Sequence, residues 1–162
     1  MTATHNVGHT TSNSISEPVI ELHQSFPSRA SAISSFVDDL MRFIRFFTEK
    51  GGTAKEAEEG IEIAIYEAVA NAVIHGNREH HEKQVHVACR CSVDGEVLIT
   101  VRDEGEGVDC RLAPRPTEAQ RLLLTHGRGV HLMRALMGEV SFEDNGRVVR
   151  MRKRMNAHGR SL

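Results

Sequence analysis

The sequence predicts an α+β fold, a two-layer α/β sandwich whose mostly antiparallel sheet has helices packed on one face. Apolar residues recur at helical spacing in residues 28–50 and 53–76, and at every second position in residues 85–93. The dipeptides Asp94-Gly95 and Asn145-Gly146 are two-residue turn signals between apolar segments. Turns this short join antiparallel neighbours, so we expect a sheet built largely from hairpins.

The N-terminal part of the chain is predicted to hold a tail, a strand and a helix. Residues 1–16 are rich in Thr, Ser, Asn and His and poor in apolar residues, which predicts a disordered tail. Residues 19–23 form the first expected strand, which is ended by Pro27. The next helix, from Ser28 or Ser31 to Lys50, gains one strongly apolar face from Ile33, Phe36, Val37, Leu40, Ile44 and Phe47.

A second helix is expected from Thr53 to Gly76. Thr53 followed by Glu56 is a capping-box pair, and Gly76 is expected to end the helix in the C′ position. The helix is mostly apolar around its whole circumference, which predicts that it is buried.

Three polar residues interrupt this apolar helix at regular intervals. Glu67, Asn71 and His75 are spaced i, i+4, i+8, so they share one stripe. A buried carboxylate costs free energy unless a partner compensates it, so Glu67 and Asn71 require a polar ligand, a metal or a cleft. The alternative is that both side chains lie on the solvated face of an amphipathic helix.

The C-terminal half is predicted to complete the sheet and to add one helix. Residues 111–126, which include two prolines, form a connector, and a helix follows over residues 130–137. Residues 140–143 and 148–153 are the two strands of the second hairpin.

The motif Asp103-Glu104-Gly105-Glu106-Gly107 stands at the end of a predicted strand. Asp103 has the parity of the apolar residues of that strand, so it emerges on their face. A carboxylate there can accept a hydrogen bond from an exocyclic amine, and two glycines let the backbone approach a ligand closely. A simple turn after a strand fits the same sequence, so this motif alone leaves both interpretations open.

The tripeptide Gly127-Arg128-Gly129 directly precedes the last predicted helix. Free N–H groups at a helix N-terminus, with little side-chain bulk around them, can bind an anion. Arg128 could add positive charge toward a phosphate. An ordinary turn before a helix is the alternative for this tripeptide.

Composition and charge narrow the function classes. The 162 residues, 40% hydrophobic and 26% charged, fit one globular domain of residues 17–155 between the tails 1–16 and 156–162. The net charge of −2 gives no electrostatic case for binding nucleic acid or an anionic membrane. No apolar run is long enough to span a bilayer. We therefore expect neither nucleic acid nor membrane as a partner.

Cysteine usage indicates the cellular compartment, and arginine placement indicates the kind of partner. Cys89 and Cys91 share one face of a strand, a poor geometry for a mutual disulfide, so we expect a reducing, cytoplasmic setting. The ten histidines show no zinc-type spacing. Arg150, Arg152 and Arg154 alternate on a strand, which favours a solvated outer face or an acidic protein partner over nucleic acid.

The three motifs together resemble the Bergerat ATP-binding fold of histidine kinases and gyrase-type ATPases. The order is a helical Glu67-xxx-Asn71-xxx-His75, then Asp103-x-Gly105-x-Gly107 after a hairpin, then Gly127-x-Gly129 before a helix. Within that fold the chain is similar to the anti-sigma-factor serine kinases. The segments 66–76 and 127–137 carry this closer likeness, which extends over roughly residues 19–154.

The resemblance implies a role for each motif. Asn71 would coordinate Mg²⁺ through its amide oxygen, and Glu67 would act as general base beside the γ-phosphate of ATP. Asp103 would accept a hydrogen bond from the adenine amino group. The other residues expected to bind the nucleotide are His75, Gly105, Gly107, Gly127, Arg128, Gly129 and Val130. Residues 111–126 would form the lid over the triphosphate.

One position departs from the family pattern. A strand near the C-terminus of the family often carries a Thr that helps to fix the adenine-site Asp. Here the sequence is Arg147-Val148-Val149, which has no hydroxyl. Either a water molecule replaces the hydroxyl or nucleotide affinity is lower.

The resemblance implies an ATP-dependent protein serine kinase that phosphorylates an anti-sigma-factor antagonist of the STAS type. Such a protein regulates transcription by partner switching with a sigma factor, and the family is compatible with a homodimer. The alternative is a nucleotide-dependent protein-binding module without kinase turnover. A histidine kinase fragment is a third class, but the helix of residues 28–50 contains no His to accept phosphate.

Overall fold

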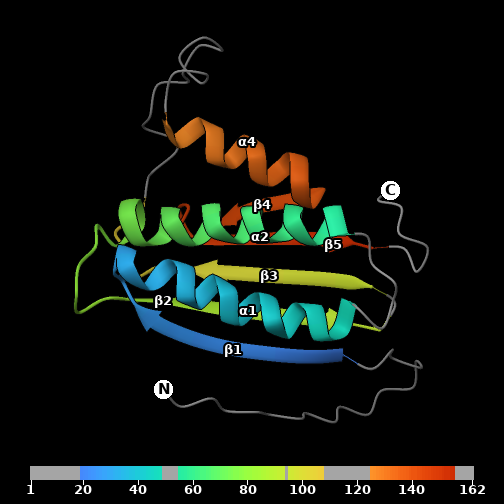
Figure 1. Ribbon diagram of the computed structural model, residues 1–162. Helices are drawn as coiled ribbons and strands as arrows, with labels where there is room; N and C mark the ends of the chain where they lie inside the picture. Colours follow the sequence, from blue (N-terminus) through green and yellow to red (C-terminus); the bar gives the residue numbers. More distant parts are fainter. Residues whose placement is uncertain (1–18, 49–54, 94, 108–124, 156–162) are drawn as a thin grey trace, which may run out of the picture.

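A computed structural model describes residues 19–48, 55–93, 95–107 and 125–155 (Figure 1). Its strands are β1 (Val19–Pro27), β2 (Gln84–Ser92), β3 (Glu96–Arg102), β4 (Glu139–Glu143) and β5 (Val148–Arg154). Its helical elements are η1 (Ala30–Ala32), α1 (Ile33–Thr48), α2 (Lys55–Ala70), η3 (Asn71–Gly76) and α4 (Thr125–Met137).

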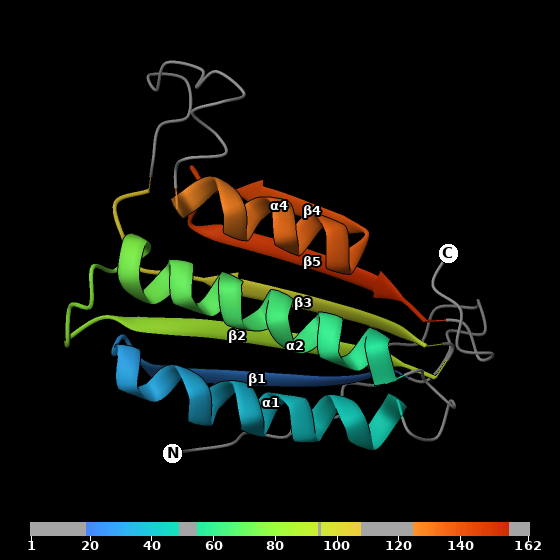
Figure 2. The same ribbon diagram turned by 45° about the horizontal axis from the view of Figure 1, so that its top comes forward.

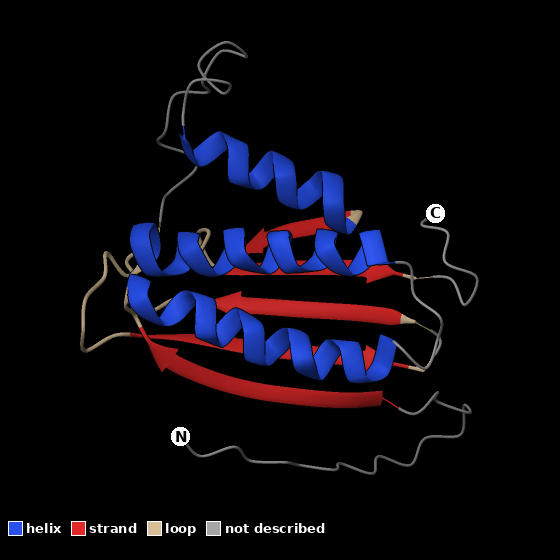
Figure 3. Cartoon of the chain, in the orientation of Figure 1, coloured by secondary structure: helices blue, strands red, loops and turns tan. Residues whose placement is uncertain are grey.

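The strands form one sheet with the order β1-β2-β3-β5-β4, and every neighbouring pair is antiparallel. The helices cover one face of this sheet, and no helix of the described residues lies on the other face, which we call the open face (Figures 1 and 3). Figure 2 shows α2 between the other two helices, with α1 on the β1 side and α4 on the β5 and β4 side. The predicted two-layer α+β architecture is confirmed.

The core lies between the sheet and the helices and follows the predicted alternation. Cys89 pairs with Ile99 and Cys91 with Val97 in the β2–β3 register, and all four side chains are buried. Both cysteines are free thiols. From α1 the core receives Ile33, Phe36, Val37, Leu40, Met41 and Ile44, and from α2 Ile61, Ala64, Ile65, Ala68 and Val69.

The second helix differs from its prediction at its surface and at its end. Ile63, Tyr66 and Ile74 are 44%, 45% and 44% exposed, so the prediction of burial all round is wrong. The sheet covers only one side of α2 and its neighbouring helices the flanks, which leaves the outer side open. The last turn, η3, is π-helical. Thr53, the predicted cap, lies outside the described residues.

The prediction that Gly76 ends the helix in a left-handed C′ conformation is also wrong. Gly76 belongs to η3, and the residues just after this helix that have positive φ are Arg78 (55°) and Glu79 (52°). The chain thus leaves the helix two residues later than expected. Gly76 is required for a different reason, its contact with Asp103, described below.

Asn77 joins the end of this helix to two strands. Its Nδ2 donates to the carbonyl oxygen of Gln84, and its Oδ1 accepts from the N–H of Glu104, each at 2.8 Å. Its own N–H donates to Ala72 O at 2.8 Å. Asn77 is only 1% exposed. One buried side chain therefore fixes the start of β2 and the end of β3 against the helix.

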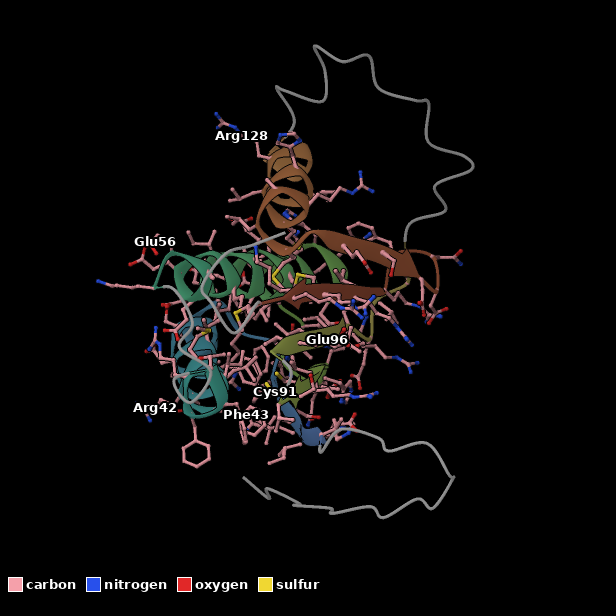
Figure 4. The ribbon with its side chains drawn as sticks, turned by 90° about the vertical axis from the view of Figure 1, so that its right-hand side faces the viewer. Arg42, Phe43, Glu56, Cys91, Glu96 and Arg128 are labelled. Carbon is pink, nitrogen blue, oxygen red and sulfur yellow. The ribbon has the colours of Figure 1, made fainter. Side chains whose placement is uncertain are left out.

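The arginines of β5 lie on the open face of the sheet and pair with glutamates. Arg152 donates to Glu96 Oε2 at 2.6 and 2.8 Å, and Arg154 donates to the same oxygen at 3.1 Å. These contacts, Arg152 foremost, hold the pKa of Glu96 below its usual range. Figure 4 shows Glu96 on the side of the sheet away from the helices. These arginines pair with glutamates on the face away from the helices, which agrees with the predicted solvated outer face.

Replacing Asn77 tests how much this buried side chain stabilises the fold. Asn77→Ala leaves the N–H of Glu104 and the carbonyl of Gln84 without their partner. We expect the free energy of unfolding to fall by about 2–3 kcal/mol, measured by urea denaturation. The control is Gln84→Ala, which removes an exposed side chain and should cost less than about 0.5 kcal/mol. Equal losses in the two variants would contradict the role of Asn77.

Candidate functional site

A cavity of about 440 Å³ opens between the end of the α2–η3 helix, the end of β3, the β4–β5 hairpin and the first turns of α4. Its walls include the apolar side chains Ala72, Val101 and Val149. The site residues predicted from the sequence that line it are Asn71, His75, Asp103, Gly107 and Val130, together with Gly76. Residues of two sequence motifs, and Val130 directly after the third motif, therefore border one cavity.

Asp103 lies at this cavity between two glycines. It is 7% exposed, and its Oδ1 accepts a hydrogen bond from the N–H of Gly105 at 2.8 Å. A Cβ on Gly76 would overlap the carboxyl group of Asp103, and a Cβ on Gly105 would overlap the carbonyl oxygen of Gly76. The helix end and the turn after β3 thus pack backbone to backbone around the carboxylate, which only glycine allows.

The surroundings of Asp103 act on its charge in opposite directions. Burial raises the pKa of the carboxyl group above its usual range, while the Gly105 N–H and the charges of Arg147 and Lys83 partly offset this increase. The N–H of Asp103 also donates to the carbonyl of Arg147 at 3.0 Å, which ties the residue to the β4–β5 hairpin. The result is a buried, fixed hydrogen-bond acceptor at the cavity wall.

Glu67 and Asn71 face the N-terminal part of α4. A Cβ on Gly129 would lie 2.7 Å from Oε2 of Glu67 and 3.4 Å from Nδ2 of Asn71. Both polar residues are half-buried, and Gly129 is buried. Asn71 lines the cavity, whereas Glu67, one turn earlier, lies outside the lining that the described residues form. The polar stripe of Glu67, Asn71 and His75 therefore begins against α4, at Glu67. It reaches the cavity at Asn71, and His75 continues it along the cavity wall.

Comparison with known proteins agrees with this geometry. A model of the histidine kinase-like ATPase domain matches residues 31–153. The chain is 36% identical to the anti-sigma F factor of Heyndrickxia coagulans over 101 residues, which cover 59% of this chain and 69% of the relative. It is 31% identical to the anti-sigma F factor of Bacillus subtilis (strain 168) over 141 residues, 84% of this chain and 93% of the relative.

The chain belongs to the histidine kinase-like ATPase family, with the anti-sigma F factors among its relatives. The predicted family is thereby confirmed. None of the helices in the described part of this ATPase domain has the length and apolar character that crossing a bilayer requires. Within the same ranges, no three His, Cys, Asp or Glu side chains gather as a metal site.

The glycine motif before α4 differs from its prediction. The helix begins at Thr125 rather than Val130, so Gly127, Arg128 and Gly129 lie inside its first turns. Only the first four N–H groups of an α-helix lack an intrahelical partner. Gly129 is the fifth residue, so its N–H is bonded within the helix and is not free for a phosphate. Its lack of a side chain instead leaves room for Glu67.

Arg128 is exposed at the N-terminal end of α4. Figure 4 shows its side chain projecting away from the rest of the domain. In this arrangement Arg128 does not border the cavity, and its predicted contact with phosphate would require the side chain to turn. Most of the predicted lid, residues 111–126, and both predicted tails lie outside the described residues.

Several cavity residues were missed by the sequence analysis. Arg147, in the segment where the family often carries a Thr, lines the cavity and pairs with Asp144 at 2.6 Å. Asn77 follows Gly76 directly, and this adjacency was the one signal that could have drawn attention to it. Other polar residues on the lining that were not predicted are Arg78, His80, Lys83, Glu106 and Asn145.

The electrostatic account of Asp103 predicts the direction of two pKa changes. Carboxyl-detected NMR titration should give Asp103 a pKa above the ordinary Asp value of about 3.9. Arg147→Met should raise this pKa further, because it removes a cation that favours the ionised form. Arg42→Met, an equal charge change on the outer side of α1, should leave it unchanged. A pKa of Asp103 at or below the ordinary value, or one indifferent to Arg147, would contradict the account.

Proposed function

We propose that this protein is an ATP-dependent protein serine kinase of the anti-sigma-factor type. The observation that carries the proposal is that Asn71, one turn from Glu67 on the same stripe, and the buried Asp103 border one cavity. The family match supports an ATP-using domain, and the residue roles below are the finer part of the proposal.

The adenine ring would occupy the cavity beside Asp103. An ionised, buried carboxylate is a strong acceptor for the exocyclic amino group of adenine. The close glycine packing fixes its position, and the apolar side chains of Val101, Val130 and Val149 supply walls for a flat ring. Because burial raises the pKa of Asp103, nucleotide affinity should fall with decreasing pH earlier than an exposed Asp would allow.

Mg²⁺ fits the donor chemistry of the polar stripe. The side chain of Asn71 borders the cavity and offers an amide oxygen, a ligand type that Mg²⁺ prefers. A single protein ligand suffices, since Mg²⁺ commonly takes its other ligands from phosphates and water. When bound, the metal would neutralise charge on the transferred phosphate.

Glu67 would act as the general base. It lies one turn from Asn71 on the same side of the helix, and Gly129 leaves space at its carboxylate. Glu67 would accept the proton of a serine hydroxyl while the serine oxygen bonds to the γ-phosphorus. The bond from that phosphorus to the β–γ bridging oxygen breaks, and ADP leaves.

The relatives are named anti-sigma F factors, which supports a sigma factor as one partner. The serine substrate would belong to an anti-sigma-factor antagonist of the STAS type, and its phosphorylation would decide which partner the kinase holds. A homodimer is part of the same proposal.

Arg147 favours a second candidate, a nucleotide-dependent binding module without turnover. The segment Arg147-Val148-Val149 lacks the hydroxyl expected near the adenine-site Asp, and Arg147 places an ion pair with Asp144 at the cavity. Such a protein would bind ATP and its partner without transferring phosphate.

The kinase proposal predicts a labelled serine. Incubation with Mg²⁺, radiolabelled ATP and the STAS-domain proteins of the source organism should label one of them on serine. Glu67→Gln should slow labelling by about 10²–10⁴-fold, because the general base is removed. Glu56→Gln, an exposed glutamate at the start of α2, should have no effect.

Calorimetric titration with ADP and ATP, read together with the labelling result, separates the two candidates. Asn71→Ala should lose the Mg²⁺-dependent part of the affinity and keep the remainder. Tight ATP binding without labelling of any antagonist would reject the kinase and leave the binding module. Absence of nucleotide binding would reject both.

A further inference from the structure

A second cavity, of about 460 Å³, lies on the outer side of the helix layer between α1 and α2. It is lined by Ser34, Val37 and Asp38 of α1 and by Glu59, Glu62, Ile63 and Tyr66 of α2. We call it the α1–α2 groove. It shares no lining residue with the nucleotide cavity. Figures 1 and 2 show the two helices side by side along their length.

The α1–α2 groove combines apolar side chains with carboxylates. Ile63 and Tyr66 are 44% and 45% exposed, one turn apart on the same side of α2. Three carboxylates belong to the lining, and no lysine or arginine does. Exposed apolar side chains grouped in a groove with a polar rim are a feature of protein-binding surfaces.

The three carboxylates of the groove differ in how well a nearby cation neutralises their charge. Arg45 pairs with Glu62 at 2.8 Å. Glu59 has Lys55 at 3.8 Å, an exposed pair that contributes little. Asp38 has no ion-pair partner among the residues that the structure describes. Net negative charge therefore remains beside Ile63 and Tyr66.

We infer that the α1–α2 groove binds a cationic amphipathic helix of a partner protein. A helix laid between α1 and α2 would place an apolar stripe against Val37, Ile63 and Tyr66. Lysines or arginines flanking that stripe would meet Asp38 and Glu59. The same charge disfavours anionic lipid and nucleic acid. This inference rests on the proposed partner binding and places it on a surface apart from the nucleotide. The kinase proposal and the groove proposal can therefore be tested separately.

A second copy of this chain is a less suitable occupant. Among the described helices, α4 offers one exposed cationic surface, on which Arg128 and Arg134 flank the exposed apolar side chain Leu132. Seating α4 of one copy in the groove of the next would be a head-to-tail contact between different surfaces. Such contacts propagate into rings or open filaments rather than closed dimers.

The test uses a defined probe on the full chain. A fluorescein-labelled 18-residue peptide, with leucines spaced i, i+3, i+4, i+7 and lysines elsewhere, is titrated by anisotropy. A peptide with glutamate in place of lysine is the control. We expect binding of the lysine peptide only, weakened by added salt. A benzophenone on one leucine should crosslink to α1 or α2.

Matched variants decide whether the groove is responsible. The double variant Asp38→Asn/Glu59→Gln should weaken binding by about fivefold or more. Tyr66→Ser should weaken it by about tenfold, with its fold checked by circular dichroism. Glu139→Gln/Glu143→Gln makes the same charge change on the open sheet face and should leave affinity unchanged.

Three outcomes would overturn the inference. One is equal loss in the two double variants, and another is crosslinking outside α1 and α2. The third is concentration-dependent polymers of the chain alone, abolished by Tyr66→Ser, which would assign the groove to a second copy. Asn71→Ala should bind the peptide normally. Peptide binding without nucleotide binding would therefore refute the proposed kinase but not the proposed role of the α1–α2 groove.

Discussion

The close contact between two backbone segments around Asp103 is the constraint on which the site depends. Gly76 at the helix end and Gly105 in the turn after β3 approach so closely that neither can carry a side chain. Asn77 holds the same junction from the other side through two hydrogen bonds to the strands. A buried acceptor is thereby fixed against a helix that carries its own polar stripe.

This junction explains why the remaining elements are placed as they are. α2 must lie across the middle of the sheet for its last turn to reach the end of β3, so α1 and α4 occupy its two sides. Gly129 of α4 then packs on Glu67 and Asn71. The side of α2 away from the sheet cannot be covered by the same packing, and Ile63 and Tyr66 stay exposed there. The cavity on one side and the groove on the other are consequences of one central helix.

Much of this arrangement could be predicted from local patterns. Period-two alternation located β2 and β3, and it correctly put Asp103 on the face of Val97, Ile99 and Val101. Helical spacing placed Glu67, Asn71 and His75 on one stripe. What failed were boundaries and environments. The start of α4 at Thr125 and the π-helical η3 depend on packing between elements, which local sequence does not record.

The positions missed by the sequence analysis share a cause. Asn77 and Arg147 act through groups distant along the chain, the backbone of Gln84 and Glu104 in one case and the carboxylate of Asp103 in the other. Neither belongs to a periodic pattern or a glycine motif. The exposure of Ile63 and Tyr66 was missed for a related reason. A helix that is apolar all round predicts burial, but its sequence does not show which side the neighbouring elements cover.

The most direct test of the account compares ADP with inosine diphosphate by calorimetry on the wild-type protein. The two ligands differ at the purine position where ADP has an amino donor and inosine diphosphate a carbonyl. If Asp103 accepts a hydrogen bond from that amino group, ADP should bind at least about tenfold more tightly than inosine diphosphate. The carbonyl of inosine diphosphate would leave the buried carboxylate facing another acceptor. Equal affinities would contradict the assignment of this cavity to an adenine base.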